Sequence, residues 1–481
     1  MFSNSISYQL AADVPASYME KLFDFIQTQY LVPQKQRFSN FSRQSSPKGR
    51  VLSYSVLDTE GKEILQVKIE GTQPIGVTIT PMLAEVSDEV IEEAKQDVII
   101  AIELFEEKTK KTTLYFAWRE GEEIVPEEFR KKEKPLTRLF LETQILLFVV
   151  FITLGTVLFL LFGQNFLVVS VALVAIQFVI LLFSTKIIAR SAEWTITEKN
   201  PYLHLLEYHL PLSENEQFKE AYPREKLIEI KEEIYREVIQ KRGEINCEDA
   251  GQILGKYGVA CQPENLVAKK IDVYGLVKKI ADKFGYKVPK IVVSNNTLPN
   301  AAASGPSPSQ GVVLITTGLF VQLNEDEVQS VLGHEFGHLK GRDPLLLFGL
   351  TSAEFLFRFN VLFLFVPWLF YNLLLFFVYF WAIMTIIFFI AKFFEARADL
   401  TSAIMLGRPQ ILANSLEKIG FQRLLYERVP SFRIQEWVGL DPHPPIYFRV
   451  QRLRKLQDPV IVKYPLWQSM KEVTAGFFKS L

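Results

Sequence analysis

His334-Glu335-Phe336-Gly337-His338 contains two of the five histidines in this chain, four positions apart and with a glutamate between them. On an α-helix, residues four positions apart share one face, so both imidazoles can reach a single metal ion. Glu335 lies beside that face, where it can act on a water molecule bound to the metal. This pattern is typical of zinc hydrolases. For the pentapeptide alone, the alternative is two solvated histidines on a surface helix.

The residues before the motif predict a small sheet followed by a capped helix. Residues 291–295 and 311–316 are apolar and β-branched, as in buried strands, and 298–304 is short and rich in small residues, as suits the edge of a sheet. Asn324 begins the helix that carries the motif, and Glu327 completes a capping pattern.

Three glycines, Gly333, Gly337 and Gly341, form one stripe along this predicted helix at four-residue intervals. Each costs roughly 1 kcal/mol relative to alanine inside a helix. The stripe therefore predicts that another backbone or helix packs closely against it; simple tolerance of glycine is the alternative.

A zinc hydrolase needs a third protein ligand and one open position on the metal. Glu395 and Asp399 follow the second apolar block of the chain and share a helix face. One carboxylate can bind the metal while the other accepts the free N–H of a ligand histidine and sets its tautomer. His443 lies at a proline-rich corner, residues 441–445, before a helix that carries Arg449. A polarised side chain there could stabilise an oxyanion.

The composition predicts a membrane protein with soluble parts. The chain has 481 residues, more than one domain's worth, and about half of its 39 phenylalanines lie in two apolar regions. The formal net charge of -1 leaves no overall basic surface, so we expect no nucleic-acid partner.

The first apolar region predicts a hairpin of two transmembrane helices. Residues 145–162 and 166–185 carry no charged side chain and flank a break at 163–165. At 1.5 Å per residue, each run spans about 27–30 Å, the thickness of the hydrocarbon core.

The second apolar region, residues 345–391, is long enough for two further spans with a turn near 367–372. One long kinked span over 360–391 is the alternative. Glu354 and Arg358 lie one turn apart in this region. They either neutralise each other and so permit insertion, or line a hydrated cavity near the active site.

Charge asymmetry predicts the orientation. Neither turn carries a charge. Basic residues lie before the first and third spans and after the second and fourth; they are Arg130, Lys131, Lys132, Lys134, Arg138, Lys186, Arg190, Lys340, Arg342, Lys392 and Arg397. The positive-inside rule therefore predicts that the N-terminal domain, the metal motif and the C-terminus are cytoplasmic.

The soluble segments predict secondary structure but show no further chemistry. Residues 1–138 predict a small α/β domain, with helices over 16–27 and 88–108 and strands over 50–57, 63–70, 76–80 and 112–118. Residues 34–50 predict a solvated loop, with contact to anionic lipid as the alternative. Residues 191–290 predict mostly helix, in which His204 and His209 lie on different faces and are structural.

Taken together, these motifs resemble the membrane zinc metallopeptidases of the HtpX/Ste24 type, peptidase family M48. The resemblance runs over roughly residues 145–457. The matching elements occur in the family's order: Asn300-Ala301, Thr317-Gly318-Leu319, the HEFGH motif with Asp343 nine residues after His334, Glu395-Ala396-Arg397-Ala398-Asp399, and His443-Pro444-Pro445 with Arg449.

This resemblance implies a role for each matching residue. It implies one zinc ion per chain, bound by His334, His338 and Glu395, with Glu335 as general base. It further implies that His443 stabilises the transition state, that Arg449 organises the site and that Asp399 supports a ligand. By the same resemblance, Asn300 and Ala301 pair with the substrate backbone. Two features depart from the family: a folded domain precedes the first span, and four spans exclude the larger Ste24 barrel of helices.

These features predict a mostly α, α+β integral membrane protein with four transmembrane helices in two hairpins. A cytoplasmic gluzincin-type metallopeptidase domain with a small sheet and an N-terminal cytoplasmic α/β domain complete it. The predicted divisions are 1–138 for the N-terminal domain, 139–190 and 344–391 for the hairpins, and 191–343 and 392–481 for the two parts of the catalytic domain.

The predicted function is a zinc-dependent endopeptidase of the cell membrane. We expect it to cleave membrane or misfolded proteins at the cytoplasmic face through a zinc-activated water, with Glu335 as general base. Its expected partners are protein or peptide substrates and the lipid bilayer. The alternatives are a zinc-dependent hydrolase of a lipid and a non-enzymatic membrane scaffold. The edge strand favours a peptide, because a lipid has no backbone to pair with it.

Overall fold

The computed structural model describes most of the chain and divides it into two compact units. The described residues are 5–10, 12, 14, 18–46, 49–83, 86–110, 113–119, 157–158, 160–162, 165–210, 224–242, 247–258, 261–305, 308–427, 430–457 and 461–480. Unit 1 comprises Met1–Ile124, Leu203–Ile271 and Glu417–Gln422, and unit 2 comprises Val125–Tyr202, Asp272–Leu416 and Arg423–Leu481.

Unit 1 contains a five-stranded antiparallel sheet in the order β1-β5-β4-β3-β2. Its strands are β1 (Ile6–Leu10), β2 (Phe38–Ser46), β3 (Gly49–Leu57), β4 (Glu63–Glu70) and β5 (Ile75–Pro81). Alternation explains these strands, because Leu65, Val67 and Ile69 of β4 are fully buried while Gln66 and Lys68 between them are exposed. The helices of this part are α1 (Met19–Phe25), the turns η2 (Ile26–Leu31) and η3 (Val32–Gln34), and α2 (Asp88–Lys110).

One predicted loop of unit 1 is wrong. Residues 34–50 contain β2, an edge strand that pairs with β3 across a bulge between Ser39 and Ser42. Phe38 is the buried apolar residue of this edge strand, and residues 39–44 after it are mostly polar and at least partly exposed. The polar composition of the strand therefore concealed it.

A second prediction for unit 1 is also wrong, because His204 and His209 lie on a strand. That strand, β8 (Tyr202–His209), lies between β6 (Thr113–Arg119) and β9 (Leu266–Asp272) in a three-stranded sheet. Residues 203–209 are all buried, so no alternation marks the strand in the sequence. Helices complete this part: α7 (Arg224–Ile234), η5 (Tyr235–Ile239), α8 (Gln240–Arg242), α9 (Cys247–Lys256) and η6 (Pro263–Asn265).

Unit 2 contains the predicted small sheet, and the predicted strands there are confirmed. Its order is β11-β12-β10-β7, with β10 and β12 parallel and the two outer strands antiparallel to them. The strands are β7 (Trp194–Ile196), β10 (Lys290–Ser294), β11 (Ala301–Ser304) and β12 (Val312–Thr316). β11 forms one edge, as its small residues indicate. The nearby helices are α10 (Val273–Phe284), η7 (Pro308–Gln310), α11 (Thr317–Gln322) and α12 (Glu325–Gly341).

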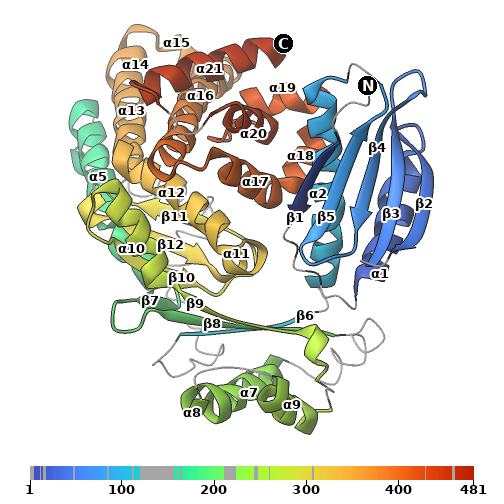
Figure 1. The fold of residues 1–481 in the computed structure, drawn as a ribbon. Coiled ribbons are helices and arrows are strands. Elements are labelled where there is room, and N and C mark those ends of the chain that lie inside the picture. The colour runs from blue at the N-terminus through green and yellow to red at the C-terminus, as the bar shows by residue number, and fades with distance from the viewer. Residues whose placement is uncertain are drawn as a thin grey trace. The chain divides into compact units, whose positions relative to one another are not determined.

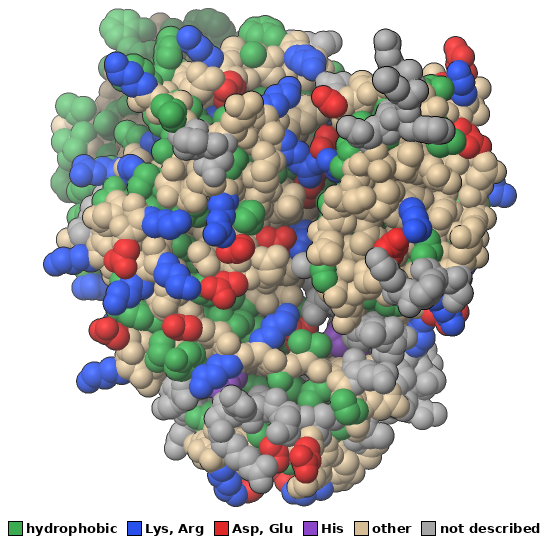
Figure 2. Space-filling model, viewed as in Figure 1, with side chains coloured by type: hydrophobic (Ala, Val, Ile, Leu, Met, Phe, Trp, Pro, Cys, Tyr) green, Lys and Arg blue, Asp and Glu red, His purple; other side chains and the backbone are tan. Residues whose placement is uncertain are grey.

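Three helices in the described part of unit 2 are long and apolar enough to cross a membrane: Phe166–Arg190, Asp343–Phe365 and Leu373–Leu406. They correspond to α5 (Phe166–Ser191), to α13 (Asp343–Phe357) continued by η8 (Arg358–Leu362) and α14 (Phe363–Phe365), and to α16 (Leu373–Leu406). Their side chains are largely exposed, and Figure 2 shows apolar side chains gathered over α5. Most of the first predicted span, 145–162, lies outside the described residues, so the count of four spans stays a prediction.

The second apolar region folds as two helices with a short connection, and the alternative of one long kinked span is wrong. α15 (Trp368–Tyr371) lies between α14 and α16, and the side chain of Asn372 caps α16 by accepting the N–H of Leu375. Figure 1 shows α13, α14, α15 and α16 following one another in unit 2. The chain continues through α17 (Pro409–Ile419), α18 (Phe421–Glu427), α19 (Pro430–Val438), α20 (Ile446–Arg454) and α21 (Pro465–Ser480).

Candidate metal centre

Helix α12 begins with a complete capping box. The Asn324 side chain accepts the N–H of Glu327, and the Glu327 side chain accepts the N–H of Asn324. Three acidic residues occupy its first turn, where they suit the helix dipole. The helix ends at Gly341, where Arg342 takes a left-handed conformation with φ 55°. The sequence prediction for this helix is confirmed at its start.

The glycine stripe of α12 lets α16 pack closely against it, as predicted. A Cβ atom at Gly337 would lie 2.9 Å from the carbonyl oxygen of Ala398 and 3.0 Å from its Cα. At Gly333 it would lie 2.5 Å from a methyl of Leu406, and at Gly341 it would overlap the Arg397 guanidinium. The glycines therefore bring the backbones of the two helices together at the level of the metal motif.

This close packing brings together His334, His338 and Glu395. The two Nε2 atoms lie 3.0 Å apart. His334 Nε2 is 3.4 Å from Glu395 Oε2, and His338 Nε2 is 3.3 Å from Glu395 Oε1. These are the residues whose donor atoms form the one candidate metal cluster within the described part of the chain.

The donor triangle fits a zinc ion. Tetrahedral zinc with ligand distances of about 2.0–2.1 Å requires its ligand atoms to be about 3.3 Å apart. The two Nε2 atoms lie 3.0 Å apart, and each lies 3.3–3.4 Å from a different oxygen of Glu395, so the three side chains bring donor atoms close enough to share one zinc ion. Oε2 of Glu395 is buried and has no hydrogen-bond partner among the described residues, as a vacant ligand atom would. Two imidazoles and a carboxylate are also a donor set that zinc prefers.

Each metal-facing imidazole is oriented from behind by a carboxylate. His334 Nδ1 lies 2.8 Å from Asp399 Oδ1, and His338 Nδ1 lies 2.8 Å from Asp343 Oδ2. At His338 the carboxylate accepts the ring N–H, which leaves Nε2 free to bind metal. At His334 the Asp399 carboxylate lies close to Nδ1 as an ion pair without hydrogen-bond geometry. The sequence reasoning gave Asp343 no such role. Two sequence signals point to it: its position five residues after His338, and its place among the residues that match the family pattern.

Two arginines in turn hold these carboxylates. Arg449 donates to both oxygens of Asp399, at 2.7 and 2.8 Å, and Arg397 donates to Asp343 at 2.5 Å. Burial alone would raise the pKa of Asp399, but the Arg449 guanidinium holds that pKa well below its ordinary value. Burial would likewise lower the pKa of Arg449, and Asp399 raises it instead. The Asp399–Arg449 pair is therefore ionised at neutral pH.

Glu335 lies next to the edge strand of the sheet. Its Oε2 accepts the backbone N–H of Ala303 at 2.8 Å. In the antiparallel ladder of β11 with β12, alternate residues turn their backbone groups to the open edge. Ala301 and Ala303 are such residues, because the neighbouring Asn300 turns its backbone towards β12: its carbonyl accepts the Thr316 N–H, and its N–H donates to Thr316 Oγ1. The open edge beside Glu335 is thus offered by Ala301, whereas the backbone of Asn300 is already paired.

His443 lies on the other side of the cluster. Its Nε2 is 3.7 Å from Glu395 Oε2, and its side chain is partly exposed. Arg449 also approaches Glu395 Oε2, at 3.9 Å. The structure therefore brings every predicted site residue except Asn300 and Ala301 around the His334–His338–Glu395 triangle, and places Ala301 on the strand that contacts Glu335.

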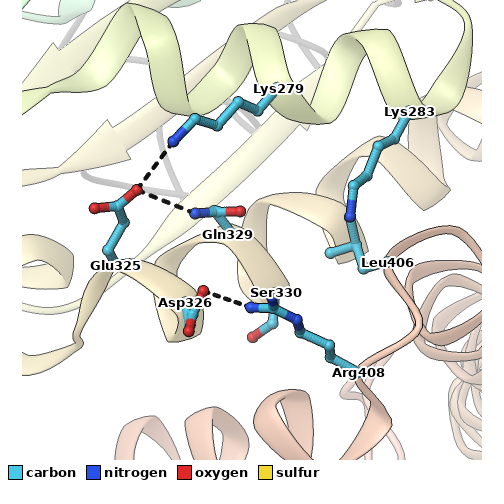
Figure 3. Close-up of a pocket in the computed structure, with 8 residues that line it drawn as sticks. All are labelled: Lys279, Lys283, Glu325, Asp326, Gln329, Ser330, Leu406 and Arg408. Atoms are coloured by element: carbon cyan, nitrogen blue, oxygen red, sulfur yellow. Dashed lines mark hydrogen bonds and ion pairs between the residues drawn. The ribbon is translucent and has the colours of Figure 1, made fainter. Parts of the chain in front are cut away.

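A separate pocket lies at the N-terminal end of α12 and contains none of these residues. Figure 3 shows its lining: Lys279, Lys283, Glu325, Asp326, Gln329, Ser330, Leu406 and Arg408. Ion pairs cross it from Lys279 to Glu325 and from Arg408 to Asp326, at 3.3 and 2.6 Å. Because these charges satisfy one another, the pocket adds nothing to the metal chemistry.

Comparison with known proteins agrees with the geometry. The model of Peptidase family M48 matches residues 268–457, which contain the whole donor triangle. A protein named Protease HtpX homolog from Pyrococcus abyssi is 30% identical over 213 residues, which cover 38% of this chain and 73% of that protein. This chain belongs to peptidase family M48. With its metal cluster and three apolar helices, it is a membrane-bound zinc metallopeptidase.

Two further similarities are more limited in extent. A Protease HtpX homolog from Thermodesulfovibrio yellowstonii is 37% identical over 94 residues, which cover 20% of this chain and 32% of that protein. The crystal structure of S. mikatae Ste24p is similar over 37% of this chain and 49% of its own, with a TM-score of 0.31 and 19% identity. That structural similarity is too low to compare the folds in detail.

Proposed function

We propose that this M48 peptidase is an endopeptidase that cleaves membrane or misfolded proteins at the cytoplasmic face of the membrane. The observation that carries the proposal is the triangle of His334, His338 and Glu395, whose separations suit one zinc ion per chain. The basic residues at the ends of the apolar segments support the cytoplasmic orientation.

The substrate chain binds as an added strand on β11. Ala301 offers backbone groups at the open edge of the sheet, and pairing with main-chain groups needs little sequence preference. The bond to be cleaved then lies beside Glu335, because Glu335 contacts the same strand through Ala303. A peptidase that acts on diverse misfolded chains needs binding of this kind.

Glu335 acts as the general base. A zinc ion in the site would supply a Lewis acid that polarises water and the scissile carbonyl. Glu335 takes the proton from the attacking water and passes it to the leaving amine. The N–H of Ala303 orients its carboxylate for both transfers. His443, with both ring nitrogens protonated, donates a hydrogen bond from Nε2 to the developing oxyanion from the opposite side of the cluster.

The remaining residues keep this arrangement rigid. Arg449 holds Asp399, Asp399 holds the Nδ1 side of His334, and Asp343 does the same for His338. These contacts keep both Nε2 atoms directed at one point, so the donor triangle is formed before substrate arrives.

Cleavage of casein by the purified full-length protein in detergent tests the proposal. We expect zinc-dependent cleavage that stops on addition of a chelator and returns with zinc. Zinc binding without cleavage of casein or other unfolded chains, accompanied by hydrolysis of a lipid, would reject the peptidase assignment. Absence of bound zinc would reject the metal centre itself.

A further inference from the structure

Asp441 lies two residues before His443 in the loop between α19 and α20. Its Oδ1 accepts the backbone N–H of His443 at 2.7 Å and lies 2.8 Å from His443 Nδ1. The opposite nitrogen of the ring, Nε2, lies 3.7 Å from Glu395 Oε2. The carboxylate and the metal cluster therefore contact opposite edges of one imidazole.

The same contact between a carboxylate and Nδ1 of a histidine occurs three times around the cluster. His334 is backed by Asp399, His338 by Asp343 and His443 by Asp441, each at 2.8 Å from Nδ1. In all three the Nε2 atom faces the region of Glu395. For the two ligand histidines, a carboxylate at Nδ1 leaves Nε2 free to bind metal. At His443, which is not a ligand, the same contact fixes the orientation of the ring, and Nε2 can donate to an oxyanion when both ring nitrogens carry a proton.

Asp441 is itself held in place by two cations. The buried Lys392 donates to its backbone carbonyl, and Arg423 lies 3.3 Å from its Oδ2. Lys392 is on α16, three residues before Glu395, so the His443 loop is tied to the helix that carries the metal-binding carboxylate. Arg423 also pairs with Glu436, away from the ring.

The end of the loop is fixed independently. Glu427 accepts the backbone N–H groups of Ile446 and Tyr447 at 2.7 and 2.8 Å, which secures the first turn of α20. The loop that carries His443 is therefore anchored at both ends. Between those anchors, the contact that the structure shows to Nδ1 of the ring comes from Asp441.

We propose that Asp441 is a positioning residue of the peptidase: it holds Nδ1 of His443 so that Nε2 faces the oxyanion position at the metal cluster. This rests on the proposed peptidase function for its kinetic consequence, but its binding consequence can be measured without turnover. The competing explanation is a purely structural turn, in which Asp441 matters only because it accepts the N–H two residues later.

Two substitutions separate these explanations. Asp441→Ser keeps a short acceptor for the backbone N–H of residue 443 but does not reach Nδ1. Asp441→Asn keeps an oxygen that can accept both N–H groups. If the ring contact matters, Ser should lower kcat by about 10–100-fold with KM little changed, and Asn should recover most of the loss. Asp326→Ser is the matched control, because Asp326 pairs with the exposed Arg408 at the other end of α12; it should behave as wild type.

The experiment uses the full-length protein in detergent with zinc content measured for every variant. Casein cleavage gives kcat and KM, and calorimetry gives the affinity of a phosphonate peptide that mimics the tetrahedral intermediate. We expect Asp441→Ser to weaken phosphonate binding about tenfold with zinc retained, and to add nothing in a His443→Ala background. Wild-type kinetics and phosphonate affinity for Asp441→Ser, or equal losses with and without His443, would overturn the proposal. If the wild type binds the phosphonate but cleaves no protein, the peptidase function fails while the Asp441 result still decides its own role.

Discussion

Two pairs of charged residues in unit 2 have the same spacing of four residues on a helix, but one pair has like charges and the other has opposite charges. In the metal cluster, Glu395 and Asp399 lie four residues apart on α16, and both are carboxylates. In the membrane region, Glu354 and Arg358 also lie four residues apart, but their charges are opposite. Two like charges need oppositely charged partners from other parts of the fold, whereas two opposite charges can neutralise each other.

The contacts show this difference directly. Glu354 accepts from Arg358 at 3.0 Å and from Tyr379 at 3.0 Å, and its charge is neutralised within the membrane region. Of the two interpretations of this pair, the structure supports mutual neutralisation. Asp399 is neutralised by Arg449, but Glu395 keeps a buried oxygen without a hydrogen-bond partner among the described residues. An unbalanced carboxylate next to two imidazoles therefore marks the site that takes an ion.

The largest expected effect is the loss of zinc from a variant of the metal cluster, compared with a variant of the Glu354–Arg358 pair. His334→Ala removes one side of the donor triangle, so we expect loss of both zinc and cleavage. Glu354→Gln in the membrane region should retain zinc and activity, because it lies outside the triangle. Metal analysis of both purified variants, together with casein cleavage, measures this. Full zinc in the His334→Ala protein would contradict the assigned site.

The next largest effect separates catalysis from zinc binding within the metal cluster. Glu335→Gln keeps the ligands but removes the base, so cleavage should fall by about 10²–10⁴-fold while zinc remains. The kinetic assay and the zinc measurement must be made on one preparation. Substantial residual cleavage would show that Glu335 is not the base.

A smaller loss of activity is expected when Arg449, which holds the carboxylate behind His334, is changed. Arg449→Lys replaces a two-pronged contact on Asp399 by a single one, which loosens the histidine behind it. We expect activity to fall by about 10–100-fold with folding preserved. Arg408→Lys, at the exposed pair with Asp326, is the matched control and should have almost no effect.

The membrane pair should affect stability more than chemistry. Glu354→Ala leaves Arg358 without its carboxylate partner among apolar side chains, and breaking a buried pair costs about 3–5 kcal/mol. Because the pair lies outside the metal cluster, we expect a lower thermal midpoint in detergent with kcat unchanged. An unaltered midpoint would mean that water or lipid headgroups already solvate the arginine.

The smallest effect concerns Glu427, another buried carboxylate, which accepts hydrogen bonds from backbone N–H groups. Burial raises its pKa to about 7, from 4.5 in the unfolded chain, although the N–H groups of Tyr447 and Ile446 oppose the rise. The folded state then holds a proton that the unfolded state has released, so its contribution to stability is lost as the pH rises from about 4.5 to about 7. Thermal unfolding at several pH values should show this trend, and Glu427→Gln should flatten it.

Part of the site was predictable because it depends on short-range pattern. The capping residues, the HEFGH spacing and the glycine stripe all act within a few turns of one helix. The uncharged runs likewise report membrane helices through length and composition alone. Strands β2 and β8 were not predictable, because one is polar at an edge and the other is buried on both faces.

The sequence by itself determined a metal-binding helix, its close-packing face and the apolar segments around it, because periodicity and composition are local properties. The family resemblance already implied Glu395 as the ligand and Asp399 as its support, and only the tertiary structure decided that Asp343 and Asp441 orient His338 and His443. Those choices depend on how α12, α16 and the loop before α20 pack. Side chains from segments far apart in the chain meet only when the whole unit is folded.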